Sequence, residues 1–342
     1  MENPTVSVIV PIRNEETCIS KCLESLLAQT YPADRYEIIV VDGRSSDRSK
    51  EIVESVCQQH ANVRLMDNPA AIAPCAMNIG IRSARGEIII RADGHNLYPA
   101  DYIENCAKYL EETGADNVGG PWLTVPANES FGARLVAAIL TSPFGVGDSP
   151  FRVSSQEGYV ETVPFGAFRR ELFDRIGLYN EKLVRNQDNE LNARIRASGG
   201  KIYQTPALRT QYHPVASFRK LLWVTFKTSQ WHLFSMAENR RAMSVRHLVP
   251  ALVVLGGFGL LLLSLYSWAA ALILGGLLGI YLLAGLCVAA LRGNPNGPGV
   301  FITLPIACLA FHCSYGLGTL AGIRYLFKPP ASRPIREGLP VA

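Results

Sequence analysis

The chain has 342 residues, of which 18% are charged and 48% are apolar, and its formal net charge is +4. This length allows one large domain and an appendage. A charged fraction below the usual ~25% indicates that part of the chain does not face water. The small net charge gives no reason to expect nucleic acid as a partner.

Eight cysteines are scattered along the chain. They form no Cys-x-x-Cys pair and no Cys/His cluster with zinc spacing, which favours reduced thiols in a cytosolic compartment. The first apolar run, residues 6–12, follows an acidic residue and is too short for a secretory signal peptide. We therefore expect neither a structural zinc nor a secretion signal.

Short apolar runs alternate with helical patterns through the first half of the chain. The apolar runs predict strands over residues 6–11, 36–41, 63–66 and 87–91. The segments between and after them predict helices over residues 16–30, 47–60, 73–84 and 98–113. This alternation predicts an α/β fold with a mainly parallel sheet covered by helices, whose ligands bind beyond the carboxyl ends of the strands.

The alternation of apolar runs and helical patterns is less regular in the later part of residues 1–212. Residues 118–183 are rich in Gly, Pro, Phe and Ser, and we predict loops and short strands there that shape an acceptor pocket. Residues 187–197 are predicted to form a helix, because Leu191 and Ile195 lie four residues apart and Gly199 follows the pattern. Residues 1–212 are thus expected to form the catalytic domain.

The composition changes after residue 212. The segment 213–246 is basic and aromatic, which predicts interfacial amphipathic helices, or alternatively an ordinary surface helix with a buried stripe. Two apolar runs over 247–291 predict a transmembrane hairpin, and 300–323 predicts a third segment, since each run is near the ~20 residues needed to cross a bilayer. Backbone groups in lipid must be satisfied internally, so these segments should be helices.

Basic residues set the expected orientation. Arg240, Arg241 and Arg246 precede the first apolar run, which places the N-terminal domain in the cytoplasm at the inner face of a multi-pass membrane protein. A third full span would put the basic tail 324–342 outside, against the same rule. The segment 300–323 is therefore either a third span or a re-entrant element.

Polar clusters follow three of the predicted strands: residues 11–16 after the first, Asp42 after the second, and Asp93 to His95 after the fourth. We expect these clusters to converge on one crevice. A carboxylate after the second strand can accept hydrogen bonds from a uracil ring or ribose. An acidic residue and another ligand after the fourth strand can hold a divalent ion against a diphosphate.

The ordered set of motifs resembles family 2 glycosyltransferases of the GT-A fold over residues 5–235. It consists of Val-Ser-Val-Ile-Val-Pro-Ile-Arg-Asn-Glu from residue 6, Val-Val-Asp-Gly from residue 40, and Asn-Ile-Gly from residue 78. Arg-Ala-Asp-Gly-His from residue 91 and Phe-Gly-Ala-Phe from residue 165 resemble, more narrowly, the ExoA subfamily of succinoglycan glucosyltransferases. The resemblance implies a GT-A catalytic domain with C-terminal transmembrane helices.

The resemblance also implies site residues. Asp42 would contact the uracil or its ribose, and the other nucleotide-sugar-binding residues would be Pro11, Arg13, Glu15, Asn78 and Asp93. Asp93 and His95 fall on the two positions of the family's metal motif. Because an imidazole replaces the usual second carboxylate, Mn²⁺ is favoured over Mg²⁺, which prefers oxygen ligands. Alternatively, His95 only hydrogen-bonds the diphosphate or is structural.

Asp188 lies where the family keeps its catalytic base, in Gln187-Asp188 instead of the usual Glu-Asp. A single base without a carboxylate nucleophile implies direct displacement with inversion. Glu190 is a rival base or an acceptor-binding group, but at the start of a helix it points away from Asp188. An acidic first turn stabilised by the helix dipole is the structural alternative.

Three further residues are weaker candidates for contact with the acceptor or a diphosphate: Arg169, Lys227 and Trp231. The last two stand in Lys-Thr-Ser-Gln-Trp, the nearest match to the Gln-x-x-Arg-Trp signature of processive synthases. Because this signature is not intact here, transfer of one sugar per acceptor is favoured over processive synthesis. The alternative is that Lys227 binds only lipid headgroups.

The expected function is an inverting transfer of a sugar from a UDP-sugar to a polyprenyl-diphosphate-linked saccharide, in exopolysaccharide biosynthesis at a membrane. Glucose as the donor sugar follows from the resemblance alone. Two alternatives remain: a polyprenyl-phosphate glycosyltransferase and a catalytically inactive membrane scaffold. A NAD-dependent oxidoreductase is disfavoured, because the turn after the first strand lacks the Gly-x-Gly-x-x-Gly motif.

Overall fold

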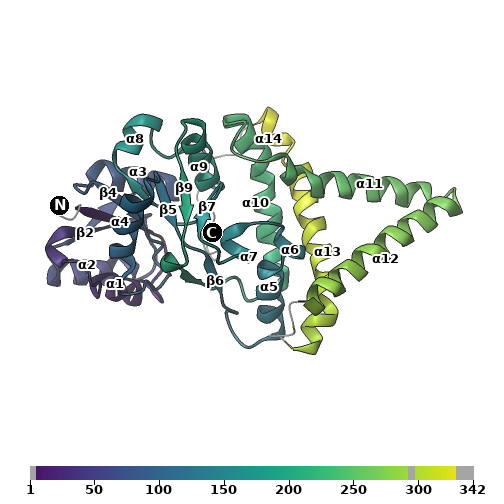
Figure 1. Ribbon diagram of the computed structural model, residues 1–342, viewed down its shortest axis with the longest axis horizontal. Helices are drawn as coiled ribbons and strands as arrows, with labels where there is room; N and C mark the ends of the chain where they lie inside the picture. Colours follow the sequence, from purple (N-terminus) through teal and green to yellow (C-terminus); the bar gives the residue numbers. More distant parts are fainter. Residues whose placement is uncertain (1–4, 292–296, 329–342) are drawn as a thin grey trace. The chain divides into compact units, whose positions relative to one another are not determined.

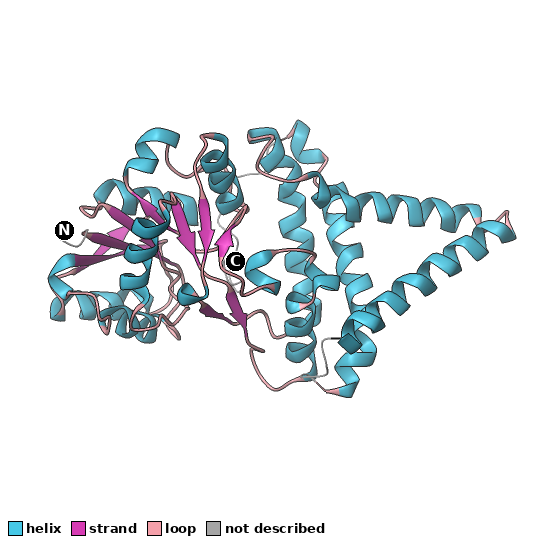
Figure 2. Ribbon diagram, in the orientation of Figure 1, coloured by secondary structure: helices cyan, strands magenta, loops and turns pink. Residues whose placement is uncertain are grey.

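The structure is a computed structural model that describes residues 5–291 and 297–328 (Figure 1). The chain divides into two compact units. The first unit contains residues 5–123 and 154–212, and the second contains 124–153 and 213–328. All strands of the main sheet lie in the first unit, whereas the second consists of helices and loops apart from the end of one short strand (Figure 2).

An eight-stranded sheet forms the centre of the first unit, in the order β3-β2-β1-β4-β8-β5-β9-β7. The first four strands are parallel, as predicted. The other half is mixed, since β8 runs antiparallel to β4 and β5, and β7 antiparallel to β9. The strands are β1 (Val6–Ile12), β2 (Tyr36–Asp42), β3 (Val63–Asp67), β4 (Ile88–Arg91), β5 (Asn117–Gly119), β7 (Gly158–Tyr159), β8 (Ala167–Arg169) and β9 (Ile202–Gln204). A separate two-stranded sheet pairs β6 (Trp122–Thr124) with β10 (Thr210–Tyr212).

Helices cover both faces of the main sheet, because successive strand side chains point to opposite faces. On β1, Val8 packs with the buried side of α1 and α4, whereas Ile9 packs with α3 and α9. The helices of the first unit are α1 (Ile19–Leu27), α2 (Ser49–Gln59), α3 (Ala73–Ser83), α4 (Tyr102–Thr113), α8 (Glu171–Ile176) and α9 (Gln187–Ala197). Two short 3₁₀ turns complete it, η1 (Ala33–Arg35) and η2 (Pro206–Leu208). The predicted GT-A-like arrangement is confirmed.

The predicted helix over residues 98–113 begins four residues late, at Tyr102. The residues before it have other partners. The Tyr98 backbone N–H donates to Ser25 Oγ at 3.2 Å, and the Tyr98 hydroxyl accepts from the Asp93 N–H at 2.7 Å. Tertiary contacts thus hold this stretch as a loop beside the end of β4.

The second unit contains a helix that the sequence prediction missed. Loops and short strands were predicted for 118–183, but α5 (Phe131–Thr141) lies within this segment, with Ser130 Oγ accepting from the Ala133 N–H at its N-terminus. The missed helix contains an apolar run, Leu135 to Leu140, within a segment that is otherwise rich in Gly, Pro, Phe and Ser. Two further short helices follow it, α6 (Pro143–Val146) and α7 (Pro150–Val153).

Three helical segments of the second unit are long and apolar enough to cross a membrane: 246–263, 268–291 and 298–327. They comprise η3 (Val245–Leu248), α11 (Val249–Leu263), α12 (Trp268–Leu291), α13 (Pro298–Ala321) and α14 (Arg324–Phe327). In each of the first two segments only 6% is buried within the protein, compared with 39% in the third segment. The hairpin α11–α12 therefore exposes apolar side chains on most of its surface.

One face of α10 (Phe218–Glu238) packs closely along α13, and the two helices lie side by side in Figure 1. Ser314 Oγ donates to the Leu222 carbonyl at 2.7 Å. A Cβ on Gly318 would lie 2.0 Å from Ser229 Oγ and 2.4 Å from the Phe226 carbonyl, so only glycine permits this approach. The glycines of the third apolar segment therefore serve helix packing.

Candidate functional site

The loops after β1 and β2 are joined at the carboxyl edge of the sheet, where Ile12 pairs with Asp42. The buried Asp42 carboxylate accepts from the Ser45 N–H at 3.2 Å and from Ser45 Oγ at 2.5 Å. Ser45 Oγ also accepts from the Asn14 N–H at 2.9 Å, and Asn14 Oδ1 accepts from the Ser46 N–H at 2.8 Å. These bonds hold Asp42 and the 13–16 loop together as one surface.

Two donor-site candidates lie on this surface. Pro11 is half-buried on β1 beside Val41. Arg13 directs one guanidinium nitrogen to within 3.5 Å of the Ala71 carbonyl, in the loop after β3. The loops after three adjacent parallel strands therefore meet around Arg13 and Asp42.

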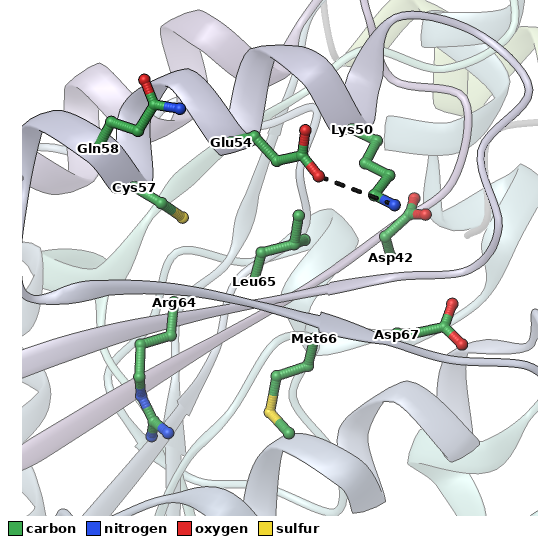
Figure 3. Close-up of a pocket in the computed structure, with 9 residues that line it drawn as sticks. All are labelled: Asp42, Lys50, Glu54, Cys57, Gln58, Arg64, Leu65, Met66 and Asp67. Carbon is green, nitrogen blue, oxygen red and sulfur yellow. Dashed lines mark ion pairs between the residues drawn. The ribbon is translucent and has the colours of Figure 1, made fainter.

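A groove extends from Asp42 along the edge strand β3 and helix α2 (Figure 3). The Lys50 side chain reaches toward Asp42, and its Nζ lies 3.7 Å from Glu54 Oε1 in an exposed pair. The groove is lined by Asp42, Lys50, Glu54, Cys57, Gln58, Arg64, Leu65, Met66 and Asp67. Carboxylate acceptors and cationic donors thus occur side by side here, as recognition of a polar, charged ligand requires.

A second cluster brings together Asp93 and Asp188, which are 95 positions apart in the sequence. Both carboxylates bind Arg91, the last residue of β4. Arg91 Nε donates to Asp93 Oδ1 at 3.1 Å, and Arg91 Nη1 donates to Asp188 Oδ1. Arg91 is 2% exposed and Asp93 is 4% exposed, whereas about 30% of the Asp188 side chain remains exposed. Of these three side chains, Asp188 is thus the one that a substrate can reach most easily.

Helix α9 places Asp188 in its first turn. The preceding Asn186 has a left-handed backbone with φ 62°, which turns the chain into the helix. Asn192, one turn on, accepts from Asn117 Nδ2 at 2.8 Å and donates to Thr162 Oγ1 at 2.7 Å. These buried bonds anchor the helix to the sheet and fix the position of Asp188.

Desolvation raises the pKa of the Asp188 carboxyl above its ordinary value, and the charge of Arg91 opposes this shift without cancelling it. A raised pKa makes a carboxylate a better proton acceptor near neutral pH. The N-terminus of α9 favours the ionised form through the helix dipole, and so acts with Arg91 against the effect of desolvation. The position therefore suits an ionised group that accepts a proton.

Arg91 was not among the residues that sequence reasoning assigned to the site. Its local signals are its place at the start of the Arg-Ala-Asp-Gly-His motif and at the end of a strand of three isoleucines, Ile88 to Ile90, and neither gives it a role in the site. Its partner Asp188 comes from a distant helix, and no sequence window contains both residues. Only the fold shows that this arginine faces inward at the strand end.

His95 lies beside the acidic end of the 13–16 loop, with Nδ1 3.3 Å from Glu15 Oε1. Burial by itself lowers the pKa of His95, but the hydrogen bond to Glu15 and the charges of Asp93 and Glu15 raise it above the ordinary value. If Nδ1 donates to Glu15, Nε2 keeps a lone pair for a metal, as in carboxylate–histidine–metal arrangements.

The residues present suit a divalent cation with few protein ligands. Asp93 Oδ2 accepts no hydrogen bond from the described residues, so one carboxylate oxygen and one imidazole nitrogen are available. No group of three or more His, Cys, Asp or Glu residues gathers as a metal site within 5–291 and 297–328. The remaining ligands of such an ion would be diphosphate oxygens and water.

Two of the predicted site residues are engaged in structural bonds. Glu190 binds Arg194 through both carboxylate oxygens, at 2.8 and 2.9 Å. Arg194 in turn donates to carbonyls at the end of α8 and in the loop after it. Asn78 donates to the Tyr179 carbonyl and accepts from the Tyr179 N–H, both at 2.9 Å. The structure thus gives both residues a role in holding the 176–181 loop.

The weaker candidate Arg169 does not join these clusters. Arg169 pairs with Ile88 at the amino end of β4, opposite to Asp93, and donates to the Leu110 carbonyl at 2.8 Å. Lys227 and Trp231 belong to the second unit. There, Lys227 Nζ lies 4.4 Å from the centre of the Trp223 ring, and Trp231 packs on Phe234 and Tyr325.

Known proteins similar to this chain are sugar-transferring and polysaccharide-synthesising proteins. The family model described as Glycosyl transferase family 2 matches residues 7–177, half of the chain. The succinoglycan biosynthesis protein ExoA of Rhizobium meliloti (strain 1021) is 28% identical over 91% of this chain and 92% of its own length. The Methanococcus voltae dolichyl N-acetyl-alpha-D-glucosaminyl phosphate 3-beta-D-2,3-diacetamido-2,3-dideoxy-beta-D-glucuronosyltransferase is 26% identical over 93% of this chain and 97% of its own.

Among solved structures, the mannosyltransferase PcManGT from Pyrobaculum calidifontis, in complex with GDP-Man and Mn²⁺, is similar with a TM-score of 0.62. The sequences are 21% identical, and the match covers 92% of this chain and 88% of that one. The likeness therefore extends beyond the first unit into the C-terminal helices, and it shows a shared fold.

Proposed function

Since the chain belongs to glycosyl transferase family 2, we propose that it transfers a sugar from a UDP-sugar to a lipid-linked saccharide at a membrane, with inversion at the anomeric carbon. The observation that carries this proposal is the Arg91-linked pair of Asp93 and Asp188. This pair lies beyond the carboxyl end of β4, on the sheet edge that also presents Asp42.

We assign donor binding to the joined loops after β1 and β2 and to the end of β4. Asp42 would accept hydrogen bonds from the uracil or ribose, and Pro11 and Arg13 would line the same surface. Asp93 and His95 would hold a divalent cation, with Mn²⁺ favoured by the imidazole. When bound, such an ion neutralises charge that develops on the diphosphate leaving group.

Asp188 is the proposed general base. The acceptor hydroxyl oxygen attacks the anomeric carbon while the bond from that carbon to the diphosphate oxygen breaks, and the electron pair leaves with the diphosphate. The hydroxyl proton moves to Asp188 Oδ2, which accepts no hydrogen bond from the described residues. One displacement without a covalent intermediate inverts the anomeric centre, so an α-linked donor yields a β-glycoside.

The acceptor is proposed to be a polyprenyl-diphosphate-linked saccharide, with glucose the sugar transferred in exopolysaccharide biosynthesis. Three helices suited to a membrane and the similarity to the Methanococcus voltae transferase, which is named for a dolichyl phosphate-linked sugar, support a lipid-linked acceptor. The similarity to a succinoglycan biosynthesis protein supports a role in exopolysaccharide biosynthesis. Arg240, Arg241 and Arg246 before the first apolar helix support a catalytic unit on the cytoplasmic side of the cell membrane.

The test uses membranes that contain the full chain, a panel of UDP- and GDP-sugars, Mn²⁺ and a lipid extract. We expect a labelled, extractable lipid-linked product from a UDP-sugar, with β configuration by NMR. A product on polyprenyl monophosphate alone would favour the alternative of a polyprenyl-phosphate glycosyltransferase. Neither transfer nor hydrolysis of any donor would favour an inactive scaffold and contradict the proposal.

A further inference from the structure

Arg91 is a charged side chain at one of the most buried positions of the first unit, 2% exposed at the end of β4. A buried guanidinium is costly unless its charge and its N–H groups are satisfied. Its partners here are the two carboxylates to which the proposed function gives different tasks, Asp93 and Asp188. An arginine at this point therefore connects the cation side of the site with the base.

The guanidinium uses separate nitrogens for the two acids. Nε donates to Asp93 Oδ1 at 3.1 Å, and Nη1 donates to Asp188 Oδ1. In each carboxylate the other oxygen, Oδ2, accepts no hydrogen bond from the part of the chain that the structure describes. One oxygen of each acid is thus held and the other is left available.

Surrounding residues fix Arg91 itself. Its backbone N–H donates to the Gly166 carbonyl at 3.0 Å, and its guanidinium carbon lies 5.8 Å from the centre of the Phe165 ring. Phe165 has a left-handed backbone with φ 55°, and a Cβ on Gly166 would lie 2.0 Å from Asn117 Oδ1. A strained phenylalanine followed by an obligatory glycine therefore packs an aromatic ring against the arginine.

We infer that Arg91 is a positioning residue that orients Asp93 and Asp188 together, leaving one oxygen of Asp93 for the cation and diphosphate and one oxygen of Asp188 for the acceptor hydroxyl. This inference rests on the proposed function. A planar guanidinium presents several N–H groups in a rigid fork, whereas a lysine has a single nitrogen on a flexible stem. Lysine keeps the charge but cannot hold both acids in this geometry.

The experiment compares Arg91→Lys with wild type in the full chain, using two readouts. Turnover at saturating donor reports on Asp188, and binding of UDP with Mn²⁺ by calorimetry reports on Asp93. Because misorienting a general base removes much of its contribution, we expect turnover to fall about 100-fold and UDP affinity about tenfold. The matched control is Arg175→Lys, at an exposed pair with Asp116, which should change neither quantity.

Two double-mutant cycles separate positioning from general support of the fold. In an Asp188→Asn background, Arg91→Lys should cost less than about threefold in further turnover. In an Asp93→Asn background, it should cost less than about threefold in further UDP affinity. A purely structural arginine would instead multiply the losses in both backgrounds. If Arg91→Lys does not fold, Arg91→Gln replaces it in the same cycles.

The inference is overturned if Arg91→Lys keeps turnover and UDP affinity within about threefold of wild type, or if both cycles are additive. Coupling in both cycles supports it. A wild-type chain that neither binds UDP nor turns over a nucleotide sugar overturns the proposed function, and this inference with it. The two failures therefore differ in the behaviour of the wild type.

Discussion

The two units bury polar groups in different ways. The first unit buries full charges, in the Arg91 pairs with Asp93 and Asp188. The second unit buries neutral hydrogen bonds among apolar helices. His312 on α13 lies with Nδ1 2.9 Å from the Tyr281 hydroxyl and with Nε2 2.8 Å from the Gly145 carbonyl.

We interpret this difference as a division of roles, in which the first unit performs the reaction and the hydrogen bonds of the second unit hold its helices together. Charged groups in a low-dielectric site are costly, and they are retained where charge develops during a reaction. Neutral hydrogen bonds between helices satisfy polar groups where water and ions are excluded. In the second unit they fasten the 142–147 segment to α12 and α13, and the Phe144 ring packs 4.8 Å from the Tyr281 ring. The largest effects on turnover are therefore expected in the first unit and effects on assembly in the second.

The largest expected effect is that of Asp188→Asn. Loss of the general base should lower turnover by about 10³-fold, or about 4 kcal/mol, while UDP binding with Mn²⁺ is retained. In the wild type, turnover should decline as the pH falls through the pKa of Asp188, which lies above the ordinary aspartate value, because only the ionised form accepts a proton. Steady-state rates across pH and calorimetry measure both.

Glu190→Gln is the companion variant. It weakens the bridge to Arg194 and should lower the thermal unfolding midpoint while keeping turnover within about tenfold. A dead Glu190→Gln beside an active Asp188→Asn would reverse the assignment of the base.

A bulky side chain between α10 and α13 should give the next largest effect. Gly318→Leu places atoms where Ser229 and the Phe226 carbonyl now lie, and overpacking of this kind costs about 1–3 kcal/mol. We expect a lower unfolding midpoint of the full chain in detergent. Gly257→Leu on α11 is the control, since a Cβ there meets nothing within 4 Å. Equal midpoints for the two variants would contradict the close packing.

Metal preference should respond more modestly. With His95 as a ligand, Mn²⁺ should support about tenfold faster turnover than Mg²⁺ at matched concentration, and His95→Asp should shift the preference toward Mg²⁺. The exposed His60→Asp is the control and should leave the ratio unchanged. Equal or faster turnover of the wild type with Mg²⁺ would remove His95 from the cation site.

The smallest effect is expected from Tyr281→Phe. Removing the hydroxyl leaves His312 Nδ1 without its partner and should cost about 1 kcal/mol of stability, with UDP binding unchanged. Thermal unfolding in detergent measures the shift. Tyr266→Phe, in the exposed turn between α11 and α12, should give none. A loss of UDP affinity in Tyr281→Phe would contradict the expectation that the hydrogen bonds of the second unit affect stability and not donor binding.

Local pattern was sufficient for the parallel half of the sheet and for its helices. The predicted helix over 187–197 has the observed bounds of α9, and the predicted strand 36–41 differs from β2 by one residue. The strand contains a continuous apolar run, and the helix is marked by Leu191 and Ile195 four residues apart and by Gly199 after its end. The three apolar helices were likewise visible from length and hydropathy.

The sequence by itself determined the class of fold, the apolar helices and the acids at the strand ends, because these depend on periodicity and composition within a short window. Only the tertiary structure decided that Arg91 joins Asp93 to Asp188, that Glu190 and Asn78 hold a loop, and that residues 124–153 belong with the C-terminal helices. Such pairings depend on which distant segments come into contact, and that is settled by packing of the whole chain and not by local preference.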